Sequence, residues 1–247
     1  MADSSPPVYI LIGATGGIGS SVTRQLAASG ARLMLGARTE SDLHNLADEV
    51  DAEAFPLDAT EYDDVQGIVD ATKDKYDRID GIVNMVGSIL LKPAHLTSIE
   101  EFRETLALNL DSAFYTVKAG ARALMRGGGS IVLSSSAVAR TGLTNHEAIA
   151  SAKAGIIGLT RSAAATYAKR DVRVNCVAPG LVDTPMSSRI LSTEQGRKQS
   201  EAMHALGRVG SPDDVADAIC WLVDTDTDWV TGQVIGVDGG LGTVRSG

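Results

Sequence analysis

A short apolar run, Val8 to Ile12, leads directly into a glycine-rich turn, which is followed by a stretch of helical period. A strand, a tight turn and a helix in this order are typical of a βα unit with parallel strands. The glycines let the backbone turn sharply and approach a pyrophosphate at the helix N-terminus. Because a purely structural turn uses similar residues, the turn by itself indicates a binding site only weakly. The residues expected at such a site are Gly13, Thr15, Gly16, Gly17, Ile18 and Gly19.

Short apolar runs alternate with longer segments of helical period along the rest of the chain, which predicts a parallel sheet covered on both faces. The expected strands are Val8 to Ile12, Ala31 to Ala37, Ala52 to Leu57, Ile79 to Val86, Ser130 to Ser135, Asp171 to Ala178 and Gln233 to Val237. The expected helices cover residues 17–29, 40–49, 61–77, 98–126, 145–169 and 212–224. We therefore predict one doubly wound α/β domain over 1–247, a Rossmann fold with a mostly seven-stranded parallel sheet.

Two segments stand outside this alternation. Residues 1–7 are short, polar and proline-containing, which predicts an N-terminal tail without the features of a signal peptide. The irregular, polar segment from about 181 to 209 follows the carboxyl end of a strand, where ligands of such sheets bind. We expect it to form a substrate lid, although a solvated helix pair fits the same pattern.

The composition excludes several classes of partner. The formal charge of −9 argues against nucleic acid and anionic membranes, since both attract basic surfaces. No run approaches the ~20 apolar residues that span a bilayer, so we predict a cytoplasmic protein. Two cysteines are too few for a disulfide framework, and the four histidines are scattered without ligand spacing. We expect no metal site.

The segment from Ser136 to Lys153 carries the chemistry. Ser136 is followed thirteen positions later by Ile149, and Lys153 comes four positions after that. The segment resembles the active site of the short-chain dehydrogenase/reductase family, in which the middle position is a tyrosine. The resemblance implies that Ser136 bonds the substrate oxygen and that Lys153 would lower the pKa of the tyrosine that donates the proton. Ile149 has no proton to donate.

Further motifs extend the resemblance to residues 8–242. The family's Gly-x-x-x-Gly-x-Gly spacing is present as Gly13, Gly17 and Gly19, although Ile12 replaces the usual threonine before it. Met85 and Val86 depart from the family's Asn-Asn-Ala-Gly segment, in which Asn84 and Gly87 match. By resemblance, Asp58 contacts the adenine, Asn84 and Gly87 lie under the ribose, Asn109 holds a water beside Lys153, Pro179 and Gly180 border the nicotinamide, and the Thr184 hydroxyl bonds the carboxamide.

The end of the second expected strand indicates which nicotinamide cofactor is preferred. NAD selection in such folds uses an acidic residue there, but this chain has Ala37 followed by Arg38. Loss of the carboxylate removes repulsion toward a 2′-phosphate, and a guanidinium forms charge-assisted bonds with it. NADP(H) is therefore favoured over NAD(H), although Arg38 as a surface charge stacked over the adenine remains an alternative.

Three groups are candidates to replace the missing tyrosine. Lys153 can act through a water held by Asn109, His146 lies two helical turns before Lys153, and Glu147 is adjacent to His146. Thr144 to Glu147 fits a capping box, which would give Glu147 a structural role and place His146 in the first turn. The spacing to Lys153 selects Ser136 from the run of serines, with a slip of one residue left open.

Three kinds of function agree with these residues. The first is an NADP(H)-dependent oxidoreductase of the carbonyl reductase or alcohol dehydrogenase type, with another proton route and a small-molecule substrate. The second is a catalytically silent cofactor-binding protein, such as a sensor or a passive subunit. The third is a lyase or isomerase on the same scaffold. The resemblance also implies a homo-oligomer, a tetramer or dimer, joined through the long helices and the C-terminal strand region.

Overall fold

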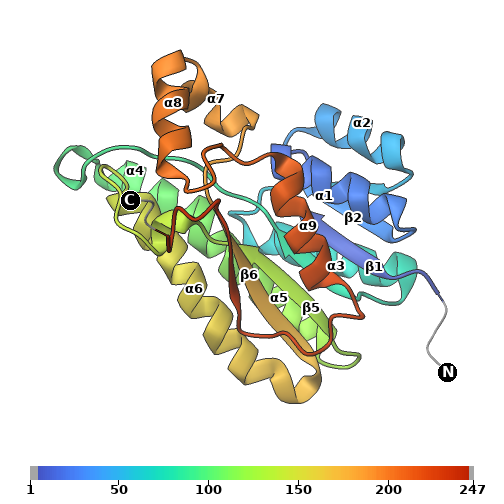
Figure 1. Cartoon of the computed structure of the whole chain (residues 1–247). Helices are drawn as coiled ribbons and strands as arrows, with labels where there is room; N and C mark the ends of the chain where they lie inside the picture. Colours follow the sequence, from blue (N-terminus) through green and yellow to red (C-terminus); the bar gives the residue numbers. More distant parts are fainter. Residues whose placement is uncertain (1–4, 245–247) are drawn as a thin grey trace.

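The strands form a single seven-stranded sheet in which every neighbouring pair is parallel. The structure is a computed structural model that describes residues 5–244 (Figure 1). The strand order is β3-β2-β1-β4-β5-β6-β7, so the sheet is doubly wound as predicted. The strands are β1 (Val8–Ile12), β2 (Arg32–Ala37), β3 (Glu53–Pro56), β4 (Gly81–Asn84), β5 (Gly129–Ser134), β6 (Val172–Pro179) and β7 (Val234–Val237).

Helices cover both faces of the sheet and divide the core into two layers. One layer contains α1 (Gly17–Ala28), α2 (Glu40–Val50) and α9 (Pro212–Val223), and the other contains α3 (Tyr62–Tyr76), α5 (Ser112–Leu124) and α6 (Glu147–Tyr167). Successive side chains of a strand point to opposite faces, so Tyr9 and Leu11 enter the first layer while Ile10 and Ile12 enter the second. Burial on both faces explains why the central strands are apolar throughout.

The helix expected over 98–126 is divided into three parts. α4 (Ile99–Leu106) starts at a Ser98 capping box, a π-helical turn follows over Ala107–Asp111, and α5 continues to Leu124. Single π turns inside helices frequently occur at functional sites. Asn109 lies in the centre of this turn.

The predicted capping box at the start of α6 is wrong. Asn145 adopts a left-handed conformation with φ of 64°, so the chain turns before the helix and His146 becomes the N-cap. His146 makes no side-chain capping bond, and Glu147 is the first helical residue. Neither Thr144 nor Glu147 therefore caps the helix as expected.

Residues 181–210 form an excursion from the sheet that is closed at its base. Leu181 O accepts from Gly210 N at 2.9 Å, and Asp183 N donates to Gly210 O at 2.9 Å. The excursion contains α7 (Ser188–Leu191) and α8 (Glu194–Met203), which stand clear of the sheet in Figure 1. Short 3-10 turns complete the chain at Ala94–Leu96, Ala137–Ala139, Ala168–Arg170 and Pro185–Ser187.

Candidate active site

The glycine turn after β1 leaves the first turn of α1 open to a ligand. Gly16 is the N-cap of α1, no side chain caps this helix, and its first turn has no acidic residue. Gly13 has a φ of +83°, and a side chain at Gly19 would collide with the Gly13 carbonyl. The turn therefore requires glycine for its shape, and the uncapped amides match the charge of a pyrophosphate. Thr15 and Ile18 belong to the same turn, where the sequence predicted them.

Thr184 packs against this turn from the opposite wall. A side chain at Gly17 would lie 2.6 Å from Thr184 Cγ2, so the glycine permits a close approach of the two segments. Thr184 N donates to Ser187 Oγ at 3.0 Å, which fixes the backbone at the start of the excursion. The structure thus brings the predicted nicotinamide segment next to the predicted phosphate turn.

The carboxyl end of β2 has the residues that the sequence predicted. Ala37 is the last residue of β2 and is buried, while Arg38 follows it and is exposed. Asp58 lies after β3, where its carboxylate accepts from Thr60 N at 2.9 Å and Thr60 Oγ1 at 2.7 Å. These bonds, together with the nearby Arg38 guanidinium, lower the pKa of the Asp58 carboxyl. Arg38 and Asp58 therefore share one end of the crevice.

Asn84 has a structural role in this molecule. Its buried amide donates to Ser112 O at 3.0 Å and to Thr116 Oγ1 at 2.8 Å, and its Oδ1 accepts from Val86 N at 2.8 Å. The side chain thereby ties the end of β4 to α5. It shapes the turn that carries Gly87.

Gly87 lies against both Asn109 and Lys153. A side chain at Gly87 would come within 2.9 Å of Asn109 Oδ1 and 3.2 Å of Lys153 Nζ. The Asn109 amide donates to Thr105 O at 2.9 Å and to Ser88 Oγ at 3.0 Å, while Oδ1 accepts from Ser88 N at 3.2 Å. The π turn thus presents a fixed carbonyl oxygen in the neighbourhood of the lysine.

Lys153 is buried, with 7% of its surface exposed, and Nζ donates to Ser134 O at 2.8 Å. Burial lowers the pKa of Lys153 to about 8, against a smaller opposing effect of Cys176. Burial also raises the pKa of the Cys176 thiol, which keeps that group neutral. Lys153 is therefore an ammonium that exchanges its proton near physiological pH, as a group that moves protons requires.

Ser136 is the serine that faces the ligand side. Ser135 is buried and donates to Lys153 O at 2.8 Å, so its hydroxyl is occupied inside the core. Ser136 Oγ has only long bonds, to Pro179 O and from Val138 N, both at 3.4 Å. The weak bonds leave its hydroxyl available to a ligand in the cavity that Ser136 lines.

An apolar cavity of about 310 Å³ joins the catalytic segment to the excursion. Ser136, His146, Ile149 and the Pro179–Gly180 segment line one side, and α7 and α8 line the other. His146 Nδ1 donates to Thr144 O at 2.7 Å, so in the neutral ring Nε2 is the acceptor. Ile149 is 5% exposed and occupies the expected tyrosine position.

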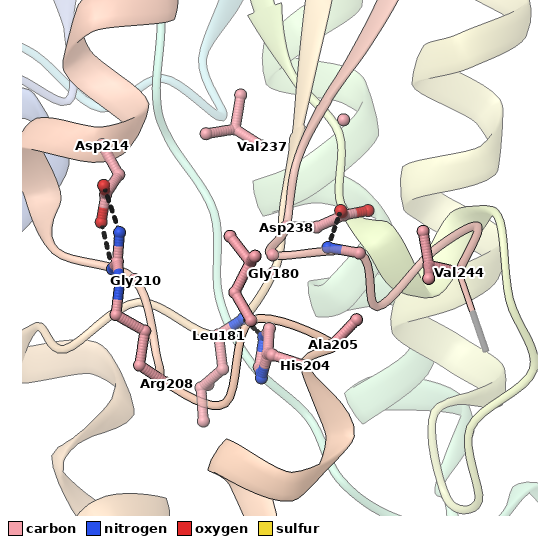
Figure 2. Close-up of a pocket in the computed structure, with 14 residues that line it drawn as sticks. Gly180, Leu181, His204, Ala205, Arg208, Gly210, Asp214, Val237, Asp238 and Val244 are labelled. Atoms are coloured by element: carbon pink, nitrogen blue, oxygen red, sulfur yellow. Dashed lines mark hydrogen bonds and ion pairs between the residues drawn. The ribbon is translucent and has the colours of Figure 1, made fainter. Parts of the chain in front are cut away.

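His204 is a buried residue of this region that the sequence reasoning missed. Its Nε2 accepts from Leu181 N at 3.1 Å (Figure 2). Its Nδ1 donates to Ser200 O at 2.7 Å, so the ring carries its proton on Nδ1. The ring lines both the 310 Å³ cavity and a second one of about 460 Å³, which Arg208 and Asp214 also line as an ion pair. His204 lies four residues after Ser200, so that contact is local in the sequence. The bond to Leu181 depends on the fold, so the sequence gives no signal for it.

The geometry suits transfer of a hydride and a proton at one carbon–oxygen bond. The open helix terminus suits a dinucleotide, Ser136 and His146 line the cavity, and Lys153 lies one helical turn after Ile149, which also lines it. Within residues 5–244, no group of three or more metal-binding side chains occurs, and no helix is long and apolar enough to cross a membrane.

Comparison with known proteins agrees with this arrangement. The family profile described as enoyl-(acyl carrier protein) reductase matches residues 13–242. A 3-oxoacyl-(acyl-carrier-protein) reductase of Thermotoga maritima is 34% identical over 242 residues, 95% of this chain and 97% of that protein.

Two solved structures are similar over nearly the whole fold. A short-chain type dehydrogenase/reductase from Mycobacterium ulcerans has a TM-score of 0.93 at 31% identity, covering 97% of this chain and 90% of that one. An actinorhodin polyketide ketoreductase variant with NADPH has a TM-score of 0.92 at 28% identity, covering 99% and 100%. Sequence, sheet topology and glycine turn thus agree, and the chain belongs to the short-chain dehydrogenase/reductase family of oxidoreductases.

Proposed function

We propose that this protein is an NADP(H)-dependent oxidoreductase of the carbonyl reductase or alcohol dehydrogenase type that works without a tyrosine. The observation that carries the proposal is the convergence of Asn109 and Lys153 at Gly87, next to a cavity lined by Ser136 and His146. The NADPH-bound ketoreductase among the similar structures supports the choice of cofactor. A small-molecule substrate, a cytoplasmic location and a homo-oligomer, a dimer or tetramer, belong to the same proposal.

A nicotinamide cofactor held by the glycine turn and Thr184 would supply or accept the hydride at the substrate carbon. Ser136 Oγ donates a hydrogen bond to the substrate oxygen and holds the carbonyl in place. Lys153 delivers the proton through a water that bonds Asn109 Oδ1, and His146, when its ring is protonated on both nitrogens, is the second candidate donor. The excursion over 181–209 closes the cavity as a lid, because α7 and α8 supply its outer wall.

The cofactor preference is tested with an Arg38→Ala variant. Loss of the guanidinium removes charge-assisted bonds to the 2′-phosphate, so we expect NADPH affinity to fall by ~10- to 100-fold and NADH affinity to change little. Titration of each cofactor, followed by its fluorescence, measures this difference. Arg32→Ala is the matched control, because Arg32 is also exposed but lies at the amino end of β2. Equal wild-type affinities for NADPH and NADH contradict the preference.

The proton route is tested by comparing Lys153→Ala with His146→Ala in carbonyl reduction. Positioned acid catalysis contributes ~10² to 10⁴-fold, so removal of the true donor should cost a factor in this range in kcat. We expect Lys153→Ala to show this loss, and a comparable loss in His146→Ala would assign the proton to the imidazole instead. Activity that is unchanged in both variants contradicts the proposed site.

A silent cofactor-binding protein is the second candidate, because Ile149 fills the tyrosine position with a buried, inert side chain. This candidate requires tight NADPH binding without turnover on any carbonyl or alcohol. The titration and the kinetic assay above separate the two functions.

A further inference from the structure

The lining of the 310 Å³ cavity contains no formal charge on the side that would hold a substrate. None of the described residues that line it is a lysine, arginine, aspartate or glutamate. Most are aliphatic, and they come from separate segments: the loop after β4, the turn after β5, the start of α6, and α7 and α8. A charged ligand group buried there finds no partner of opposite charge.

Most polar side-chain atoms of the lining already form hydrogen bonds with other groups of the protein. Both ring nitrogens of His204 bond backbone groups, and the Ser200 hydroxyl donates to Gly196 O at 2.8 Å. The polar groups that face the cavity from the catalytic side are Ser136 and His146 Nε2, so hydrogen bonding is concentrated at one end. The opposite wall offers the Gln199 amide and otherwise apolar contacts.

Several aliphatic side chains of this lining are only partly covered. Ile89 is 39% exposed, Leu91 44% and Met203 41%. A ligand that covers them removes apolar surface from water at each contact, which favours binding. The volume stands at the lower end of the ~300–1,000 Å³ range of ligand pockets, so it suits a compact molecule.

We propose that the substrate is a compact, uncharged ketone or secondary alcohol with an apolar body, and that the cavity rejects carboxylates and phosphates. The assignment rests on the proposed oxidoreductase function. The Ser136 hydroxyl donates to the substrate oxygen, and the apolar body lies against Leu91, Met203 and their neighbours. Ile149 extends this apolar surface where a phenol would have provided a hydroxyl.

The test uses two ligands that differ by one group, cyclohexyl methyl ketone and cyclohexylglyoxylate, which carries a carboxylate in place of the methyl. Both are titrated calorimetrically into the full chain saturated with 1,4,5,6-tetrahydro-NADPH, a cofactor analogue whose nicotinamide-derived ring is uncharged and donates no hydride. We expect the ketone to bind at least ~100-fold more tightly, since the carboxylate loses its hydration without gaining a partner.

A Met203→Arg variant should reverse this selectivity, because it places a guanidinium in the cavity wall. We expect the affinity for the ketone to fall and the affinity for the carboxylate to rise by ~10-fold or more. Met125→Arg is the matched control, because Met125 is similarly exposed at 38% but borders a cavity after α5. The control should bind both ligands as the wild type does.

The outcomes separate this proposal from the one on which it rests. Failure of NADP+ and NADPH to bind contradicts the proposed function, and the two ligands are then titrated into the protein alone. Equal or tighter binding of the carboxylate, or no binding of the ketone, overturns the assigned substrate class in either titration.

Discussion

Ile149→Tyr should raise the rate of NADPH-dependent carbonyl reduction by ~10² to 10⁴-fold, the usual contribution of a positioned acid. Residue 149 lies four positions before Lys153 in α6, so both side chains lie on one face of the helix. A phenol there faces the cavity that Ser136 also lines, which has room for its ring. The substitution thereby places a phenolic proton donor directly beside a lysine that is already in place.

Ile149→Phe is the matched control, because it adds nearly the same volume without a hydroxyl. Steady-state reduction of a neutral ketone is measured for the wild type and both variants. A gain confined to the tyrosine variant assigns the effect to proton donation. An equal gain in both variants would mean that ring packing is responsible, and no gain would contradict the arrangement of Ser136, Ile149 and Lys153.

The stability of the wild type relative to Lys153→Met should rise by ~3 kcal/mol between about pH 8 and pH 10.5. Burial lowers the pKa of Lys153 from 10.5 to about 8, so the unfolded chain binds its proton more tightly than the folded one. Acid therefore favours unfolding of the wild type within this window. Below about pH 8 the buried ammonium destabilises the wild type by the full amount. Above about pH 10.5 this destabilisation is absent.

Urea unfolding of both proteins at several pH values measures this relative stability. Titration of other groups, such as the buried Tyr9, affects both proteins alike and cancels in the difference. Lys153→Met should be the more stable protein at neutral pH, with the gap closing as the pH rises. Parallel stability profiles would show that Lys153 keeps an ordinary pKa in the folded state.

The sheet and the glycine turn could be predicted because they depend on local pattern. The order is an apolar run in β1, then the glycines, then the helical period of α1. These three features are adjacent in the sequence, so neighbouring residues alone indicate the βα unit. The observed strand ends differ from the predicted ones by one or two residues. Hydrogen bonding with the neighbouring strands, which are distant in sequence, decides where each strand ends. The choice of Ser136 as the active-site serine rests on its spacing to Lys153 in the sequence and stays a prediction.

Other features depend on contacts between distant segments and had no local signal. The left-handed Asn145 displaced the expected capping box, although Thr144 to Glu147 has the right composition for one. The π turn around Asn109 interrupts a stretch whose helical period is continuous. The bond between His204 and Leu181 joins residues 23 positions apart, so no rule based on residue spacing predicts it.

The closed base of the 181–210 excursion makes this segment an insertion that can vary without moving the sheet. The Leu181–Gly210 and Asp183–Gly210 bonds fasten its two ends, and the His204 ring adds a third attachment near Gly180. Chain between such anchors can vary in length at a small entropic cost, because loop closure depends only weakly on length. Substitutions in α7 and α8 should therefore change what the cavity accepts without disturbing the glycine turn.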